Sequence, residues 1–146
     1  MEDEKAKRKL GALDTKHCAL FLCDIQEKFE KSIDKFQMVV SNAERVAKAA
    51  NILGIPILAT EQYPKGLGPT VEELGLAKHA IAPFPKTCFS MIIPELMDAL
   101  KAEQEETKSV ILCGIETHAC IHHTAIDLIE RGIEVWLKDY SDLKLM

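Results

Sequence analysis

The chain has 146 residues, enough for one domain with a hydrophobic core and too few to expect two. Hydrophobic residues make up 47% of the chain and charged residues 28%, which is typical of a globular protein and excludes a disordered or fibrous one. With a formal net charge of -5, the chain lacks the excess of positive charge that is typical of proteins that bind nucleic acid or an anionic membrane. We therefore expect neither as a partner.

Residues 1–17 are predicted to be a flexible charged tail, and residues 18–146 a single domain. The first eleven residues have no apolar core, unlike a secretory signal, and their acidic residues argue against a mitochondrial presequence. No apolar run approaches the roughly 20 residues that cross a bilayer. The five cysteines form an odd set without a CxxC pair, which favours reduced thiols. We therefore expect a cytoplasmic protein.

Unbroken apolar runs predict the strands of the domain. They are residues 18–23 (CALFLC), 55–59 (IPILA), 109–115 (SVILCGI) and 133–137 (IEVWL). Continuous runs of this length suit strands that are covered on both faces, as in a parallel sheet. A further short strand is expected within residues 80–90, with Lys86 at its exit.

Helices are predicted between these strands. Apolar residues recur every three or four positions over 36–53, which indicates an amphipathic helix that ends at Gly54. A second helix is expected to begin near Pro94, and a third to run from about His118 to Arg131. The alternation of strand and helix predicts an α/β, doubly wound sheet. Residues 61–75 contain two prolines and three glycines and are expected to form a functional loop.

Polar and reactive residues follow the predicted strands. In an open parallel sheet, ligands bind beyond the carboxyl ends of the strands, and Asp24, Lys86 and Cys120 would all lie at that edge. A cysteine thiolate is a nucleophile, and a nearby cation, base or helix N-terminus favours it. Cys120 falls in the first turn of the third helix, with Thr117 as the expected N-cap. Lys86 would supply the positive charge, and Asp24 would take the thiol proton.

Two other interpretations of these residues stay open. Taken singly, an aspartate after a strand is often only a turn former, a lysine a surface charge, and a cysteine a small core residue. A zinc site is the second alternative, with ligands from His118, Cys120 and His122 and from Cys113 or His123. All of these come from one short segment, and the zinc-deaminase signature is absent, so we expect no metal. His122 and His123 would then flank a helix, one partly buried and one exposed.

Four segments resemble the isochorismatase-like cysteine hydrolases, most of all the eukaryotic isochorismatase domain-containing proteins. They are FLCDIQEKF, ILATEQYPKGLGPTVEELG, KTCFSM and ILCGIETHACI, within residues 18–139. The resemblance implies a three-layer, Rossmann-like fold with a mostly parallel sheet. It also implies that Asp24, Lys86 and Cys120 are the catalytic triad. It further implies a cis peptide bond after Ile115, which would turn the backbone amide of Glu116, with that of Cys120, toward an oxyanion.

The sequence departs from the family in two places. The nicotinamidase branch binds a metal through an Asp-x-His motif after the second strand, whereas this chain has Glu61, Gln62 and Tyr63 there. We therefore expect no metal and no cofactor. Family members usually continue past the strand that matches residues 133–137 with another helix and strand. This chain reads YSDLKLM and stops, so we expect a domain shortened at its C-terminus.

The sequence thus predicts a cysteine hydrolase that attacks a small amide or related carbonyl substrate through Cys120. The alternative is a catalytically impaired short form that acts as a protein-interaction module. A homo-oligomer is expected in either case. Candidate residues of the substrate pocket are Gln26, Phe29, Glu61, Gln62, Phe89 and Thr117.

Overall fold

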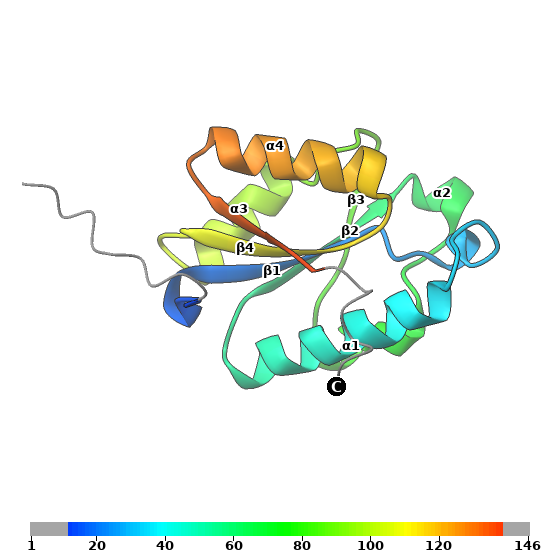
Figure 1. Ribbon diagram of the computed structural model, residues 1–146, viewed down its shortest axis with the longest axis horizontal. Coiled ribbons are helices and arrows are strands. Elements are labelled where there is room, and N and C mark those ends of the chain that lie inside the picture. Colours follow the sequence, from blue (N-terminus) through cyan, green and yellow to red (C-terminus); the bar gives the residue numbers. More distant parts are fainter. Residues whose placement is uncertain (1–11, 139–146) are drawn as a thin grey trace, which may run out of the picture.

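The computed structural model describes residues 12–138, which form a five-stranded parallel sheet between two layers of helices (Figure 1). The sheet order is β3-β2-β1-β4-β5. The strands are β1 (Cys18–Cys23), β2 (Ile57–Gln62), β3 (Phe84–Lys86), β4 (Ser109–Gly114) and β5 (Glu134–Leu137). The helices are α1 (Phe36–Ile52), α2 (Pro64–Leu67), α3 (Pro94–Glu103) and α4 (His122–Glu130). The predicted α/β fold with a parallel sheet is confirmed.

Strand β1 lies at the centre of the molecule, and all six of its residues are buried. Its side chains alternate between two apolar clusters, as the pleat of a strand requires. Cys18, Leu20 and Leu22 pack in the cluster that includes α1, whereas Phe21 and Cys23 pack with residues of α3 and α4 on the opposite face. Figure 1 shows α1 below the sheet, and α3 and α4 above it. Continuous apolar runs therefore reflect burial on both faces.

The second strand is shifted along the chain from its predicted position, residues 55–59. The backbone amide of Ile55 donates to Ala50 O at 2.9 Å, so this residue closes the end of α1 instead of entering the sheet. At the other end, Glu61 and Gln62 pair with residues of β3, which extends β2 through Gln62. The pairing could not be foreseen because β3 has only three residues.

The third helix begins differently from its prediction over 118–131. Residues Thr117–Ile121 form a π-helical turn in which the amide of Ile121 reaches back to Glu116 O at 3.1 Å, and α4 follows. The expected N-cap at Thr117 is wrong, because Glu116 takes the position before the turn and no side chain caps it. The predicted helix end is confirmed, since Gly132 follows with a φ of 73°.

The remaining predictions concern the ends of the chain and the long loop. Residues 15–17, within the predicted tail, form a 3-10 turn. Residues 1–11 and 139–146 lie outside the described part of the chain. The expected shortening of the domain at its C-terminus therefore falls on residues that are not described. The loop over 61–75 contains the end of β2, helix α2 and the 3-10 turn Glu72–Leu74. Other 3-10 turns span Glu27–Phe29 and Leu76–His79. Among residues 12–138, no helix is long and apolar enough to cross a membrane.

Candidate active site

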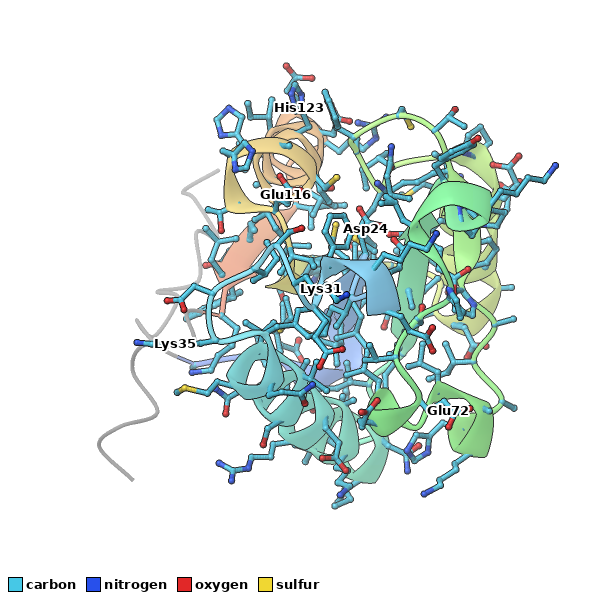
Figure 2. The ribbon with its side chains drawn as sticks, turned by 90° about the vertical axis from the view of Figure 1, so that its right-hand side faces the viewer. Asp24, Lys31, Lys35, Glu72, Glu116 and His123 are labelled. Atoms are coloured by element: carbon cyan, nitrogen blue, oxygen red, sulfur yellow. The ribbon has the colours of Figure 1, made fainter. Side chains whose placement is uncertain are left out.

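Three segments that are distant in the sequence meet at the carboxyl edge of the sheet. Asp24 directly follows β1, Lys86 is the last residue of β3, and Cys120 lies in the π-helical turn after β4. Lys86 Nζ donates to Asp24 Oδ2 at 2.8 Å and lies 3.6 Å from Cys120 Sγ. The three residues are 0%, 5% and 6% exposed, respectively. Figure 2 views this edge, with Asp24 near its centre.

The Asp24 carboxylate is held at both oxygens. Thr60 Oγ1 donates to Asp24 Oδ1 at 2.8 Å, while Oδ2 accepts from Lys86 and, at 3.5 Å, from Cys23 Sγ. The backbone of Asp24 is left-handed, with a φ of 54°, a conformation that aspartate tolerates better than most residues. The turn after β1 therefore aims the carboxylate along the sheet edge toward Lys86 instead of outward to solvent.

The Lys86 ammonium is surrounded by acceptors. Besides Asp24, it donates to Gln62 Oε1 at 2.7 Å, to Phe89 O at 2.9 Å and to Cys88 O at 3.1 Å. Burial disfavours the charged ammonium, but the charge and hydrogen bond of Asp24 outweigh burial, and the pKa of Lys86 is raised. Lys86 is therefore a fixed positive charge beside the sulfur of Cys120.

Cys120 differs from the other buried thiols in its electrostatic surroundings. A hydrogen bond with the Cys23 thiol lowers the pKa of Cys120, against the opposing effect of burial, and the charge of Lys86 lowers it further. At Cys113 burial dominates and raises the pKa to about 12, although the charge of Lys138 acts in the opposite direction. Of the two thiols, Cys120 is the one suited to act as a nucleophilic thiolate.

The turn that carries Cys120 begins with a cis peptide bond between Ile115 and Glu116, as the family resemblance implied. Just before it, Gly114 has a φ of 137°, and a Cβ atom at this position would lie 2.1 Å from Cys23 O. Only glycine allows β4 to pass so close to β1. The role of the Glu116 and Cys120 amides as an oxyanion hole remains a prediction.

Two predicted pocket residues, Gln26 and Glu61, form hydrogen bonds with the long loop. Gln26 is fully buried: its side-chain nitrogen donates to Gln62 O and Gly68 O, each at 2.9 Å, and its Oε1 accepts from the Gln62 amide at 2.7 Å, while its place in the pocket wall remains a prediction. The Glu61 carboxylate accepts from the backbone amide of Thr70 at 2.7 Å and from its hydroxyl at 2.9 Å. Gln62 itself contacts Lys86 and so belongs to the site.

The other pocket candidates, Phe29, Phe89 and Thr117, are all at least partly exposed. Phe89 is 54% exposed, and its ring stacks on His123 with centroids 5.3 Å apart. Phe29 packs partly buried against the α1 side of the core, and Thr117 is exposed. His122 and His123 are both exposed, which corrects the expectation that one of them is partly buried.

A cavity of about 570 Å³ lies beside the π-helical turn, and the sequence did not reveal it. It is lined by Ile33, Val39, Leu112, Ile115, Thr117 and Leu137, among others. Cys120 is not among its lining residues. The cavity depends on the approach of α1, β4 and β5, which no local pattern encodes.

Donor atoms of Cys23, Asp24 and Cys120 lie within 4.8 Å of one another, a spacing that a metal ion could use. The Lys86 ammonium already contacts two of these residues, so its positive charge disfavours a second cation there. Among the described residues, the histidines of the zinc alternative belong to no such cluster, and His118 pairs with Glu116 Oε2 at 3.0 Å. Sequence reasoning missed Cys23, whose only signal was its place next to Asp24.

Comparisons with known proteins agree with this architecture. Residues 18–139 match the isochorismatase domain. The chain is 52% identical over 130 residues to isochorismatase domain-containing protein 2A of Mus musculus, covering 89% of this chain and 61% of the relative. It is 53% identical over 126 residues to isochorismatase domain-containing protein 2 of Danio rerio, covering 86% and 62%. The chain thus spans less than two thirds of these curated relatives.

Solved structures of similar fold include the MAR1 ribonuclease of Caenorhabditis elegans, with a TM-score of 0.76 and 44% identity over 86% of this chain and 64% of that one. The YcaC gene product of Escherichia coli, described as an octameric hydrolase of unknown specificity, has a TM-score of 0.71 and 28% identity over 86% and 63% of the two chains. The sequence match covers residues 18–139, and the match to the Caenorhabditis elegans structure covers a similar share of the chain, 86%. The chain therefore belongs to the isochorismatase family.

Proposed function

We propose that Asp24, Lys86 and Cys120 form the centre of a cysteine hydrolase that acts on a small amide or related carbonyl substrate. The observation that carries this proposal is the buried contact of Lys86 Nζ with Asp24 Oδ2, at 2.8 Å, and with Cys120 Sγ, at 3.6 Å. A buried ion pair is weak evidence for a stabilising role, because the cost of desolvating both charges offsets much of their attraction. An ammonium shared by a base and a thiol is suited to activating a nucleophile.

The proposed reaction has two steps. The Cys120 thiolate attacks the substrate carbonyl carbon, and the backbone amides of Glu116 and Cys120 hold the developing oxyanion. Asp24, having taken the thiol proton, gives it to the leaving amine, which leaves an acyl group on Cys120. Asp24 then accepts a proton from water, which attacks the thioester and releases the acid. Lys86 keeps its proton throughout and stabilises the thiolate and the carboxylate.

The surroundings of Cys120 favour a small substrate. The residue is 6% exposed, so a reactive carbon must enter a narrow space to reach the sulfur. The similar protein of Caenorhabditis elegans is described as a ribonuclease, but the net charge of -5 and the burial of Cys120 argue against a polynucleotide substrate here. A substrate screen should therefore pair small amides with a single-stranded RNA.

The primary experiment is thiol labelling as a function of pH. Labelling of Cys120 should rise with pH at a midpoint below that of an ordinary cysteine. Lys86→Ala should move this midpoint upward, because it removes the cation beside the thiolate. Asp24→Asn should move the midpoint downward, because it removes a negative charge that disfavours the thiolate. An ordinary midpoint that responds to neither substitution would rule out the triad.

Turnover and the acyl intermediate are tested by mass spectrometry. Incubation with the small amides should add an acyl group to the peptide that contains Cys120, and Cys120→Ala should abolish both this adduct and hydrolysis. Cys88→Ala is the matched control, because Cys88 is exposed and only its carbonyl contacts Lys86. Cleavage of RNA that survives Cys120→Ala would separate a nuclease activity from this site.

We also infer that the chain assembles with copies of itself in the cytoplasm. Support for assembly comes from the octameric relative of Escherichia coli. Support for the compartment comes from the five cysteines, all of which are unpaired. Size-exclusion chromatography with light scattering should give more than the monomer mass. Elemental analysis of the purified protein tests the prediction that no metal is bound, and a stoichiometric metal would contradict it.

A further inference from the structure

Cys23 places a second thiol at the candidate active site. Its sulfur lies within 4.8 Å of both Cys120 Sγ and the Asp24 carboxylate. Cys23 ends β1 and Cys120 lies in the turn after β4, yet both side chains belong to the same apolar cluster, on the face covered by α3 and α4. Cys18 and Cys113 differ in this respect: Cys18 packs in the opposite cluster, on the α1 face, and so does Cys113.

We propose that Cys23 is a resolving cysteine, which forms a reversible disulfide with Cys120 when a hydroperoxide oxidises the nucleophile. The disulfide would occupy the sulfur that the hydrolase needs and so switch the enzyme off. This inference rests on the reactive thiolate of the proposed function, but its chemistry needs no substrate.

The reaction proceeds in two balanced steps. The Cys120 thiolate attacks an oxygen of the hydroperoxide, the O–O bond breaks, and the products are a sulfenic acid on Cys120 and, after protonation, an alcohol or water. Cys23 then attacks the Cys120 sulfur, an S–S bond forms, and the S–O bond breaks. The hydroxide leaves as water with the proton of Cys23. Cys120 and Cys23 together lose two electrons, and the peroxide gains them.

The surroundings of Cys23 supply what the second step requires. Burial raises the pKa of the Cys23 thiol, so at neutral pH it needs a base before it can attack. Cys23 Sγ donates to Asp24 Oδ2 at 3.5 Å, which makes the carboxylate that base. Because Cys23 is 0% exposed, it is shielded from direct oxidation, and the oxidant meets Cys120 first.

The sulfurs must approach from within 4.8 Å to a bond length of about 2.05 Å. A change of side-chain rotamer at either cysteine moves its sulfur by a distance of this order. Cys120 sits in a π-helical turn of five residues, a short element able to adjust, whereas Cys23 is fixed in the central strand. The turn is therefore the part expected to move when the bond forms.

Peptide mapping of the unaltered chain gives the direct test. The reduced protein is treated with equimolar hydrogen peroxide, and its remaining thiols are blocked with iodoacetamide in denaturant. We expect a cross-linked peptide pair that joins Cys23 to Cys120, lighter by two hydrogens than the sum of the reduced peptides. Dithiothreitol should restore labelling of Cys120 completely. Pairing of Cys120 with another cysteine, or its conversion to sulfinic acid instead, would overturn the proposal.

Two variants sharpen the result. In Cys23→Ala, peroxide should carry Cys120 to acids that dithiothreitol does not reverse. The matched control Cys88→Ala removes the exposed thiol and should keep the Cys23–Cys120 link. Because Cys23→Ala also removes the hydrogen bond that lowers the pKa of Cys120, the chains are compared at alkaline pH, where both carry the thiolate. If Cys23→Ala does not fold, peptide mapping of the unaltered chain still shows whether Cys23 and Cys120 form a disulfide.

The same samples distinguish the two ways in which the idea could fail. If Cys120 labels with a lowered pKa but no link to Cys23 forms, the switch is wrong and the hydrolase proposal is retained. If Cys120 labels like an ordinary thiol and forms no link, the thiolate of the proposed function is wrong as well.

Discussion

At the scale of single residues, Asp24 combines its proposed chemical role with an unusual backbone conformation. Its φ is 54°, a region that asparagine enters readily and alanine does not. Asp24→Asn and Asp24→Ala both leave the thiolate as the remaining anion beside Lys86. We expect hydrolysis to fall by about 100-fold or more in either variant. In denaturant titrations, the free energy of unfolding of Asp24→Ala should be lower than that of Asp24→Asn by about 1–2 kcal/mol. Equal stabilities would argue against backbone strain at Asp24.

Thr60 is a positioning residue for the same carboxylate. It is 1% exposed, and its hydroxyl donates to Asp24 Oδ1 at 2.8 Å. Thr60→Val keeps the shape but leaves this oxygen without a donor, so we expect a loss of about 1–3 kcal/mol in the free energy of unfolding. Thr60→Ser keeps the donor and serves as the control. The pH dependence of Cys120 labelling should shift in Thr60→Val alone, and a shift of equal size in both variants would contradict this role.

At the scale of elements, the site depends on how closely the ends of β1 and β4 approach each other. Gly114→Ala would place a Cβ atom 2.1 Å from Cys23 O, so the ends of both strands must separate. Gly54→Ala is the matched control, because Gly54 also has a positive φ, 69°, but has no atom within 4 Å of the added carbon. We expect Gly54→Ala to cost about 1–2 kcal/mol. Gly114→Ala should cost about 1–3 kcal/mol more, by urea unfolding, and should slow Cys120 labelling.

The same scale explains what sequence could predict. The apolar run over 18–23 and the periodicity over 36–53 reveal β1 and α1. A strand buried on both faces needs consecutive apolar residues, and a helix buried on one side needs apolar residues every three or four positions, so both patterns are visible in the local sequence. Asp24, Lys86 and Cys120 could be proposed as a triad because each lies at or after the end of a predicted strand. By contrast, the contacts of Gln26 reach residues 36 and 42 positions away, so its burial could not be inferred. Cys23 was missed for the same reason, since its partner Cys120 approaches only through the pairing of β1 with β4.

At the scale of the whole molecule, both helix layers share one central strand. Because β1 contributes side chains to both apolar clusters, neither layer can lose its packing alone. We therefore expect a single cooperative thermal transition. Far-ultraviolet circular dichroism and the fluorescence of Trp136, the one tryptophan in the chain, on the edge strand β5, should change together. An earlier change at Trp136 would indicate a loose sheet edge and favour the alternative of an interaction module.

The hydrogen bonds of Lys86 connect Cys120 with the segment that contains residues 88 and 89. An ammonium carries three protons, but five acceptor atoms lie around Lys86 Nζ, on Asp24, Gln62, Cys88, Phe89 and Cys120. These acceptors therefore compete for the protons. When the sulfur of Cys120 loses its negative charge, as a thioester or a disulfide, it accepts a hydrogen bond from Lys86 less strongly. The carbonyl oxygens of residues 88 and 89 should then accept more strongly from Lys86. We therefore expect the hydrogen bonds from Lys86 to the segment that bears the exposed ring of Phe89 to strengthen when the sulfur of Cys120 is occupied.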